Sequence, residues 1–296
     1  MIVPTHRRPE QLATCLESLA ALDYPADRYE VVVVDDGGDP RLDAVAERFH
    51  GRLAATWIRQ ARQGPAGARN QGAARALGEL LAFTDDDCRP TPGWLRRLAE
   101  EHARGSQVIL GGYTRNALVG NPFSTTSQLI VDAGYDRHNR DRDDARFLTS
   151  NNLAVPAAGF RDIGGFDAAF VTSEDRDLCD RWVASGRRMR YLPDAVVEHA
   201  HDLTLRGFCL QHFGYGRGSQ RFHLAHARRT GRRIRLELPF YLDLHRRGWS
   251  YRGVGRKLEI QAALLVWHAV NSAGYVCQWW RSRDRRLRRR LGGSRS

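Results

Sequence analysis

The sequence lacks the marks of several common protein classes. Its five cysteines are odd in number and form no CxxC pair, so neither a zinc site nor a disulfide framework is indicated and reduced thiols are expected. The opening residues MIVPTHRRPE contain no apolar core of a secretory signal. No GxGxxG follows the first predicted strand, which argues against a dinucleotide-dependent dehydrogenase.

Lysine is nearly absent, because Lys257 is the only one among 296 residues, and the basic charge is almost all arginine. The formal net charge of +12 is unevenly distributed: residues 1–220 carry 27 Arg against 30 acidic residues, whereas residues 221–296 carry 18 Arg, one Lys and four acidic residues. Such asymmetry is typical of an appended segment that meets an anionic surface. The slightly acidic first part lacks the basic face that a specific nucleic-acid-binding domain needs. The basic tail alone could bind RNA or DNA only without sequence specificity.

Short apolar strands alternate with helical patterns in the first third of the chain. Residues 2–3, 31–34 and 80–83 form apolar runs, and 31–34 is typical of a strand buried on both faces. Leu12, Leu16 and Leu19 share one helical face, a second helical pattern covers residues 42–49, and a third begins at Gly64-Pro65. This alternation predicts a mostly parallel α/β sheet. Further along, strands are expected at 147–155, 190–192 and 195–198, and helices near 174–186 and at 203–218.

Three consecutive carboxylates, Asp85-Asp86-Asp87, follow the strand at 80–83 through Thr84. Like charges this close repel one another unless a cation lies between them, and hard carboxylate oxygens suit Mg²⁺ or Mn²⁺. A solvated acidic turn or a helix cap is the alternative. Ligands of open α/β sheets bind beyond the carboxyl ends of the strands, where Pro4-Thr5 and Asp35-Asp36 are also expected.

Two further groups can carry chemistry. Glu174-Asp175 open a predicted helix, where they serve either as partners of the helix dipole or as a general base at the ligand edge. His199 follows a predicted strand and is either a structural residue or a metal ligand, with His201 as the competing candidate.

The ordered motifs PTHRRP, VVVVDDGG, GARNQGAARALGE, LLAFTDDDC, SNNLAV, GGFD, SEDRDLCDRW and VVEHAH resemble those of family 2 glycosyltransferases with the GT-A fold. The resemblance covers roughly residues 1–220. It implies a GT-A-type, Rossmann-like, mostly parallel sheet flanked by helices, with a nucleotide-sugar half at about 1–105 and an acceptor half at about 106–220. Residues 221–296 are then a helical, Arg-rich extension. Family members usually have a few more residues before the first strand, so we expect that strand to be weakened here.

The family implies a nucleotide-sugar donor, a divalent metal and inverting transfer to an acceptor hydroxyl. Carried onto this chain, the resemblance implies a role for each of the following residues: Pro4, Thr5, Asp35, Asp36, Arg69, Asp85 and Asp86 on the donor; Asp85, Asp87 and His199 on Mg²⁺ or Mn²⁺; Asp175 beside Glu174 as general base; and Trp94, Gly165, Phe166 and Asp167 toward the acceptor. The acceptor class stays open between a glycan, a lipid-linked sugar and a small molecule.

A sugar nucleotidyltransferase would share the sheet and the metal carboxylates. Enzymes of that kind resemble one another in a Gly-rich phosphate loop with Arg and Lys after the first strand, where this chain reads PTHRRP. A polybasic protein that binds nucleic acid or membranes without transferase activity is the other alternative.

The basic tail has two interpretations. Residues 260–280 contain no Asp, Glu, Arg or Lys and precede RSRDRRLRRR, which suits an interfacial helix with a polybasic anchor. A helix that packs on the catalytic domain and leads into a solvated tail is equally consistent. Trp267, Tyr275, Trp279 and Trp280 favour the interface, because aromatic side chains prefer the level of lipid headgroups. We therefore expect a cytoplasmic protein, with an anionic membrane surface as a partner of residues 260–296.

Overall fold

A computed structural model describes the backbone of residues 1–105, 107–232 and 238–292, and the side chains up to residue 283. Residue 106, where the two predicted halves meet, and the side chains of 284–296 in the basic tail lie outside this description. The chain divides into two compact units. Unit 1 comprises residues 1–119, 134–169 and 174–201, and unit 2 comprises 120–133, 170–173 and 202–296.

One sheet of eight strands forms the centre of unit 1, in the order β3-β2-β1-β4-β7-β6-β8-β5. The strands from β3 to β4 run parallel, as do β6 and β8, whereas β7 and β5 are antiparallel to their neighbours. The strands are β1 (Ile2–Thr5), β2 (Val31–Asp36), β3 (Ala55–Gln60), β4 (Leu80–Phe83), β5 (Cys88–Pro90), β6 (Val108–Asn116), β7 (Leu153–Pro156) and β8 (Arg188–His199).

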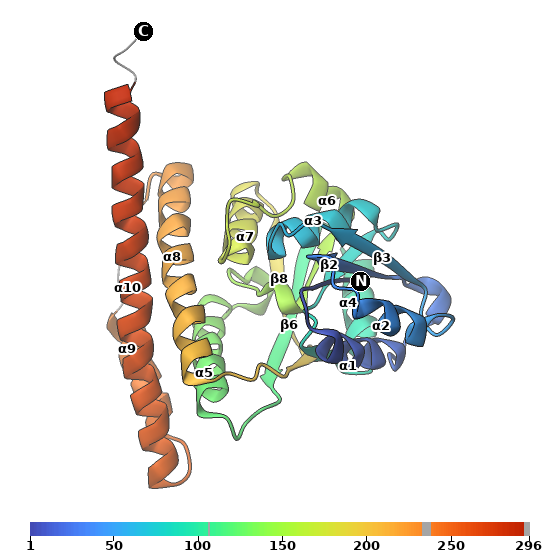
Figure 1. Cartoon of the computed structure of the whole chain (residues 1–296), viewed down its shortest axis with the longest axis horizontal. Helices are drawn as coiled ribbons and strands as arrows, with labels where there is room; N and C mark the ends of the chain where they lie inside the picture. Colours follow the sequence, from blue (N-terminus) through green and yellow to red (C-terminus); the bar gives the residue numbers. More distant parts are fainter. Residues whose placement is uncertain (106, 233–237, 293–296) are drawn as a thin grey trace. The chain divides into compact units, whose positions relative to one another are not determined.

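Helices cover both faces of this sheet. They are α1 (Pro9–Ala20), α2 (Leu42–Phe49), α3 (Pro65–Arg75), α4 (Trp94–Arg104), α6 (Ala157–Asp162) and α7 (Glu174–Ala184), with short 3₁₀ turns at Ala26–Arg28, Arg142–Asp144 and Ser150–Asn152. Figure 1 shows α1, α2 and α4 on one face and α3 and α6 on the other. The first face holds a core of buried side chains from β1, β2 and these three helices.

Local sequence explains where several elements begin and end. All six residues of β2 are buried, as expected for a central parallel strand. Gly64 adopts a positive φ of 83° and Pro65 occupies the first turn of α3, the start that the Gly-Pro pair predicts. Strand β1 pairs with β2 along all four of its residues and with β4 at Ile2–Phe83, and the expected weakening of the first strand stays a prediction.

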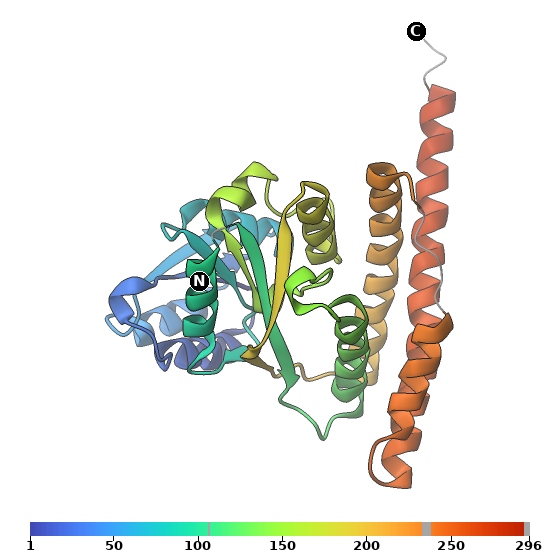
Figure 2. The ribbon, with the colours of Figure 1, turned by 180° about the vertical axis from the view of Figure 1, so that it is seen from behind.

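Two strand predictions need correction. The strand predicted at 147–155 begins only at Leu153, because Ser150–Asn152 forms a 3₁₀ turn in which Asn152 is fully buried and its amide donates to two backbone carbonyls. The two short strands predicted around Pro193 are one strand, β8. It runs beside β6, and the register shifts from Gly112–Leu192 to Tyr113–Val196, so a bulge accommodates the proline. Figure 2 shows β6 and β8 side by side.

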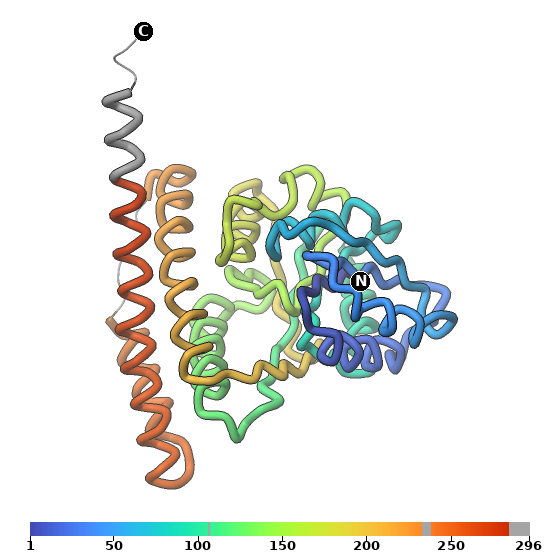
Figure 3. Tube along the Cα trace, viewed as in Figure 1, coloured from blue at the N-terminus to red at the C-terminus, as the bar shows by residue number. Residues whose placement is uncertain are grey.

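Unit 2 is helical. It contains α8 (Leu205–Thr230), α9 (Leu238–Trp249), α10 (Val254–Gly292) and the first part of α5 (Pro122–His138). Figure 3 traces α8 and α10 side by side. Glycine allows the two helices to approach closely. A Cβ added to Gly274 would lie only 2.1 Å from the Phe213 carbonyl oxygen, and one added to Gly216 only 2.0 Å from the Asn271 carbonyl oxygen. The core of this unit contains Leu129, Phe208, Leu244, Ile260, Leu264 and Trp267.

The helix predicted at 203–218 extends to Thr230, so the domain boundary predicted at residue 220 falls inside α8. Thr204 caps its start by accepting a hydrogen bond from the Gly207 amide, and Gly231 ends it in a left-handed conformation. The division into residues 1–220 and 221–296 stays a prediction. No helix among the described residues is both long enough and apolar enough to cross a bilayer.

Candidate active site

Polar side chains gather where β1, β2 and β4 end, at the carboxyl edge of the parallel part of the sheet. Thr5 closes β1, Asp35 and Asp36 close β2, and the carboxylates Asp85–Asp87 follow β4. The parallel register pairs Thr5 with Asp35, so these strand ends are neighbours. This edge is where open α/β sheets bind ligands.

Asp35 and Asp36 hold the loops of this edge. Asp35 accepts hydrogen bonds from the backbone of Gly38 and Asp39. Asp36 accepts from the Gln60 amide and from the backbone of the loop that precedes α3, at Gln63 and Gly64. Both carboxylates are nearly fully buried, and their hydrogen bonds fix the loops at the carboxyl edge of the sheet.

Asp86 is the most deeply buried of the three consecutive carboxylates. Its oxygens accept hydrogen bonds from the Thr5 hydroxyl at 2.7 Å and from the Arg8 guanidinium at 3.2 Å. Burial raises the pKa of Asp86 to about 6, although the charge of Arg8 acts in the opposite direction. Arg8 also contacts Asp87 at 3.0 Å, and it therefore partly neutralises the triplet.

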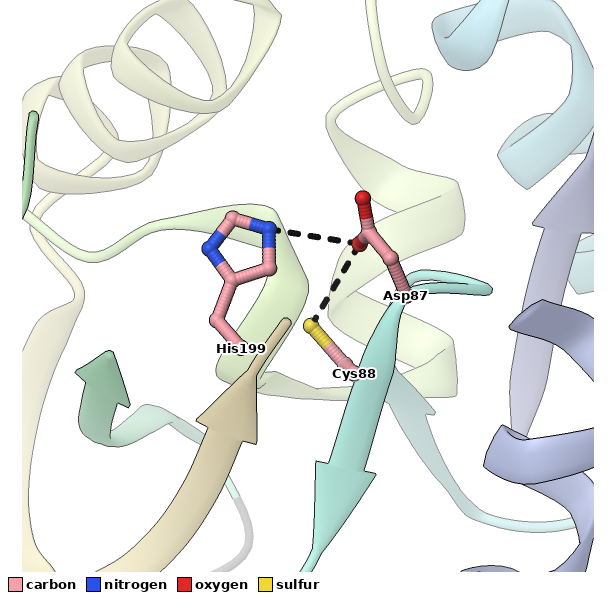
Figure 4. A group of neighbouring side chains, drawn as sticks. All are labelled: Asp87, Cys88 and His199. Carbon is pink, nitrogen blue, oxygen red and sulfur yellow. Dashed lines mark hydrogen bonds and ion pairs between the residues drawn. The ribbon is translucent and has the colours of Figure 1, made fainter. Parts of the chain in front are cut away.

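Asp87, Cys88 and His199 form a group whose ligand atoms all lie within 4.8 Å of one another (Figure 4). The antiparallel pairing of β5 with β8 brings them together, because Cys88 lies directly opposite His199. His199 Nε2 is 3.2 Å from Asp87 Oδ1, and the Cys88 thiol donates to the same oxygen at 3.9 Å. Carboxylate and imidazole are ordinary ligands of Mn²⁺, so the donor set fits a divalent cation.

Electrostatics couples His199 to Asp87. Burial raises the pKa of Asp87, but the hydrogen bond and charge of His199 outweigh it and bring the pKa well below its ordinary value. For His199, burial lowers the pKa and Asp87 more than compensates, so the net pKa is raised. His201 stacks on His199 with ring centroids 4.9 Å apart, and burial lowers its pKa to about 4. His199 thus contacts the triplet directly.

Arg69 joins Asp85 to Glu174. Its guanidinium donates to Asp85 at 2.6 Å and to Glu174 at 2.8 Å, and its side chain is only 4% exposed. Despite its burial, which lowers the pKa, the two carboxylates raise the pKa of Arg69 above its ordinary value. The Asp85 side chain keeps 30% of its surface exposed, so it remains accessible at the edge of the site. Through this one side chain, α3 links the end of β4 to the start of α7.

Glu174 and Asp175 occupy the first turn of α7, the helix that the sequence predicts here. Glu174 is buried and Asp175 is half-buried. Burial raises the pKa of both carboxyl groups, against the opposing effects of Arg69 on Glu174 and of the Arg176 amide on Asp175. A carboxylate with a raised pKa beside a ligand edge is suited to accept a proton near neutral pH.

The turn predicted to face the acceptor is fixed onto α3. Asn70 accepts from the Phe166 amide and donates to the Phe166 carbonyl, while Gly165 adopts a positive φ of 67°. The Phe166 ring is buried against Phe83, and Asp167 is exposed. Trp94 is fully buried, and its indole donates to the Asn152 amide oxygen. Trp94 is therefore part of the core and presents no exposed surface to an acceptor.

Several contacts of this site were not predicted from the sequence, including that of Gln60 with Asp36. Arg8, Cys88 and Asn70 each touch a predicted site residue. Cys88 directly follows the carboxylate triplet, and this adjacency is the signal that could have identified it. Asn70 carries the same signal, because it directly follows Arg69. Arg8 carries none, because its partners Asp86 and Asp87 lie far away along the chain.

The sequence was compared with protein families and with characterised proteins. The sequence profile described as "Glycosyl transferase family 2" matches residues 1–163. The pre-mycofactocin glycosyltransferase of Mycobacterium tuberculosis is 27% identical over 238 residues, covering 78% of this chain and 48% of the relative. The validoxylamine A glucosyltransferase of Streptomyces hygroscopicus is 31% identical over 235 residues, covering 69% of this chain and 56% of the relative. The chain thus spans about half the length of these curated relatives.

Solved structures show the same fold. The mannosyltransferase PcManGT from Pyrobaculum calidifontis, in complex with GDP-Man and Mn²⁺, superposes with a TM-score of 0.63 over 93% of this chain and 74% of its own, at 22% identity. Residues 1–349 of Staphylococcus aureus TarS, in complex with UDP-GlcNAc, superpose with a TM-score of 0.58 over 93% of this chain and 88% of that one, at 16% identity. The predicted GT-A-type α/β fold is confirmed, and with a family profile that covers more than half of its residues the chain belongs to glycosyl transferase family 2.

Proposed function

We propose that this protein is an inverting glycosyltransferase, which moves a sugar from a nucleoside-diphosphate donor to an acceptor hydroxyl. The observation that carries the proposal is the meeting of Asp87 with His199 at the carboxyl edge of the sheet, beside the Asp85–Arg69–Glu174 chain. Family membership and the sugar nucleotides bound in the two solved relatives support it.

A divalent cation fits this edge. Asp87 and His199 would hold it, with Asp85 at the partly exposed end of β4, and a bound cation would stabilise the charge that develops on the departing diphosphate. The imidazole favours Mn²⁺ over Mg²⁺, because Mg²⁺ prefers oxygen ligands. The buried Cys88 thiol, whose pKa burial raises, stays protonated and donates to Asp87 instead of competing as a thiolate.

We propose that Pro4, Thr5, Asp35, Asp36, Arg69, Asp85 and Asp86 shape the donor site. Thr5 fixes the Asp86 carboxylate, and Asp36 fixes the loop at Gln63-Gly64. These contacts hold the strand ends in one arrangement, so donor binding requires little ordering of the protein. The donor class is a nucleoside-diphosphate sugar.

Asp175 is the proposed general base. A carboxylate within hydrogen-bond reach of the acceptor hydroxyl would take its proton as the new glycosidic bond forms. The bond from the anomeric carbon to the nucleoside diphosphate would break on the opposite side. Glu174 is held by Arg69 and positions the start of α7 against the donor edge. The turn at Gly165–Asp167 supports the acceptor side, for a glycan, a lipid-linked sugar or a small molecule.

The metal and base roles separate in two variants. Asp87→Ala is expected to abolish metal-dependent donor binding, whereas Asp175→Asn is expected to keep donor binding and lose transfer. Donor binding is measured by calorimetry with Mn²⁺, and turnover by hydrolysis of the donor when no acceptor is supplied. Asp162→Ala, an exposed ion-pair residue of unit 1, is the matched control and is expected to retain both. Equal loss of donor binding in the first two variants would contradict the assigned roles.

Release of inorganic diphosphate from a nucleoside triphosphate and a sugar phosphate would instead indicate a sugar nucleotidyltransferase.

We further propose a cytoplasmic location, because nucleotide sugars are made there. Residues 1–220 would then act as the catalytic domain and 221–296 as its extension. Fractionation of cells that express the full chain tests the location, and recovery of the protein outside the cytoplasmic and membrane fractions would contradict it.

A further inference from the structure

Exposed apolar side chains concentrate in unit 2. Among the described residues, all the exposed large apolar side chains except Leu77 and Val119 belong to this unit. Helices α9 and α10 contribute nine of them: Leu238, Leu242, Trp249, Val254, Leu258, Leu265, Val276, Trp279 and Trp280. Contiguous exposed apolar surface of this kind marks an interaction site.

On α10 seven of the exposed side chains form one stripe along the helix. Residues 258, 262, 265, 269, 272, 276 and 279 repeat at alternating intervals of four and three, all are exposed, and they read Leu, Ala, Leu, Ala, Ser, Val, Trp. At 1.5 Å per residue the stripe is roughly 30 Å long. The opposite side of the helix holds Ile260, Leu264 and Trp267, which are buried in the core of unit 2. Among the described residues, α10 therefore has one apolar face buried in unit 2 and a second apolar face that is exposed.

Basic residues stand at both ends of this stripe. Arg252 and Lys257 lie at its start, where Arg256 forms an ion pair with Glu259, and Arg281 and Arg283 follow its end. The Arg283 guanidinium lies over the Trp279 ring at 4.6 Å and near Trp280 at 6.0 Å. Between Ile260 and Trp280 the sequence contains no charged side chain apart from any protonated histidine. An apolar stripe with cationic ends and terminal tryptophans matches the layers of an anionic bilayer surface.

We propose that the exposed stripe of α10 docks on an anionic lipid surface, with α10 lying in the plane of the interface. Leu258, Leu265 and Val276 would enter the acyl boundary, and Trp279, Trp280 and Arg283 would lie at headgroup level. The proposal concerns unit 2 alone and stands without the transferase activity.

A second copy of the chain fits the stripe less well. A parallel pair would bring Arg281 and Arg283 of the two copies together, and an antiparallel pair would bring them against Arg252 and Lys257. Like charges meet in either orientation, which opposes association. A nucleic acid would use the arginines but leave the leucines, valine and tryptophans exposed to water.

Vesicle binding by the full chain tests the proposal. Vesicles of phosphatidylcholine alone are compared with vesicles that also contain phosphatidylglycerol, by co-sedimentation at low and high salt. The chain is expected to bind the anionic vesicles, with binding weakened by salt. The paired substitution Leu265→Ser with Trp280→Ser is expected to lower the partition coefficient at least tenfold. Leu77→Ser, at an exposed leucine of unit 1, is the matched control and is expected to bind as the wild type does.

A second pair of variants tests the charges. Arg281→Gln with Arg283→Gln is expected to weaken binding to anionic vesicles by more than tenfold, since each charge near the surface contributes about a factor of five. All four replaced side chains are exposed, so circular dichroism and the melting temperature should not change. Undiminished binding by Leu265→Ser with Trp280→Ser would overturn the proposal. So would a lipid-independent dimer that this variant dissociates, or salt-sensitive binding to duplex DNA without binding to vesicles.

Discussion

Arg69 is the residue on which the arrangement of the site most depends. It lies between Asp85 and Glu174 and is almost completely buried, so its removal would leave the two carboxylates without their shared partner. Breaking one side of a buried ionic contact is costly because the remaining charge stays desolvated.

We therefore predict that Arg69→Met lowers the free energy of unfolding by about 3 kcal/mol. Arg97→Met is the matched control. Arg97 forms a partly exposed ion pair with Glu100, and its replacement should cost less than about 1 kcal/mol. Chemical denaturation monitored by circular dichroism measures both. An Arg69 variant as stable as the control would show that the bridge does not organise the site.

The raised pKa of Asp175 determines the pH dependence that we predict for transfer. Burial raises the pKa of this carboxyl group, so it remains protonated at pH values where an ordinary aspartate, with a pKa near 4, is ionised. The base must be ionised to accept a proton, and kcat/KM should therefore rise with pH through the raised pKa. A profile measured from acid to neutral pH should place this ascending limb above the ordinary range. A flat profile above about pH 5 would contradict the assignment of Asp175 as the base.

Individual residues were predictable where their neighbours lie close in sequence. The Asp85–Asp87 triplet and Glu174-Asp175 stand out because each follows or opens an element with a clear pattern. Trp94 and Arg8 were not predictable, since their surroundings depend on strands that pair across the whole sheet. Trp94 is buried because α4 packs on the sheet. No local sequence pattern distinguishes a buried tryptophan from one that faces a ligand.

At the scale of elements, apolar runs and glycine signals identified β1, β2, β4 and α3, whereas β3, β5 and β6 were missed and β7 was predicted to begin too early. Strand β3 reads ATWIRQ and is only partly buried, because it lies at the edge of the sheet. Strand β5 has three residues and exists through its pairing with β8. Edge strands and short strands draw their stability from partners, so their own sequences carry weak signals.

Two glycines of α10 should respond in opposite ways to replacement by alanine. A Cβ at Gly274 would collide with the backbone of α8, whereas Gly255 has open space around it. Gly274→Ala should destabilise unit 2 by about 1–3 kcal/mol, since the two helices must move apart. Gly255→Ala should stabilise it by up to about 1 kcal/mol through helix propensity. Thermal unfolding of the two variants compares them directly. A Gly274 variant at least as stable as the wild type would refute the close approach of α8 and α10.

At the scale of the whole molecule, the charge asymmetry of the sequence follows the C-terminal helices. Sequence patterns detected the basic segment, but they did not show that its helices contribute to a core. Ile260, Leu264 and Trp267 of α10 pack with Phe208 of α8, so residues beyond 220 complete the core of unit 2. A boundary drawn by charge therefore differs from one drawn by packing.

Truncation tests the role of this packing. A chain that ends at residue 230 would expose Leu129 and Phe208, and we expect it to aggregate. A chain that ends at residue 283 keeps every described side chain of the core and should remain monodisperse. Size-exclusion chromatography with light scattering distinguishes the two. A stable monomer that ends at residue 230 would contradict the packing role of α9 and α10.

The most direct test of the central claim is a thermal-shift screen of UDP, GDP, dTDP and CDP sugars, each with and without Mn²⁺, on the wild type and on Asp87→Ala. The account predicts that one nucleotide class raises the melting temperature of the wild type only when Mn²⁺ is present, because ligand binding to the folded state stabilises it. The Asp87 variant should show no such increase. If no donor shifts a folded wild-type sample, or if the shift persists in Asp87→Ala, the proposed metal-dependent donor site is wrong.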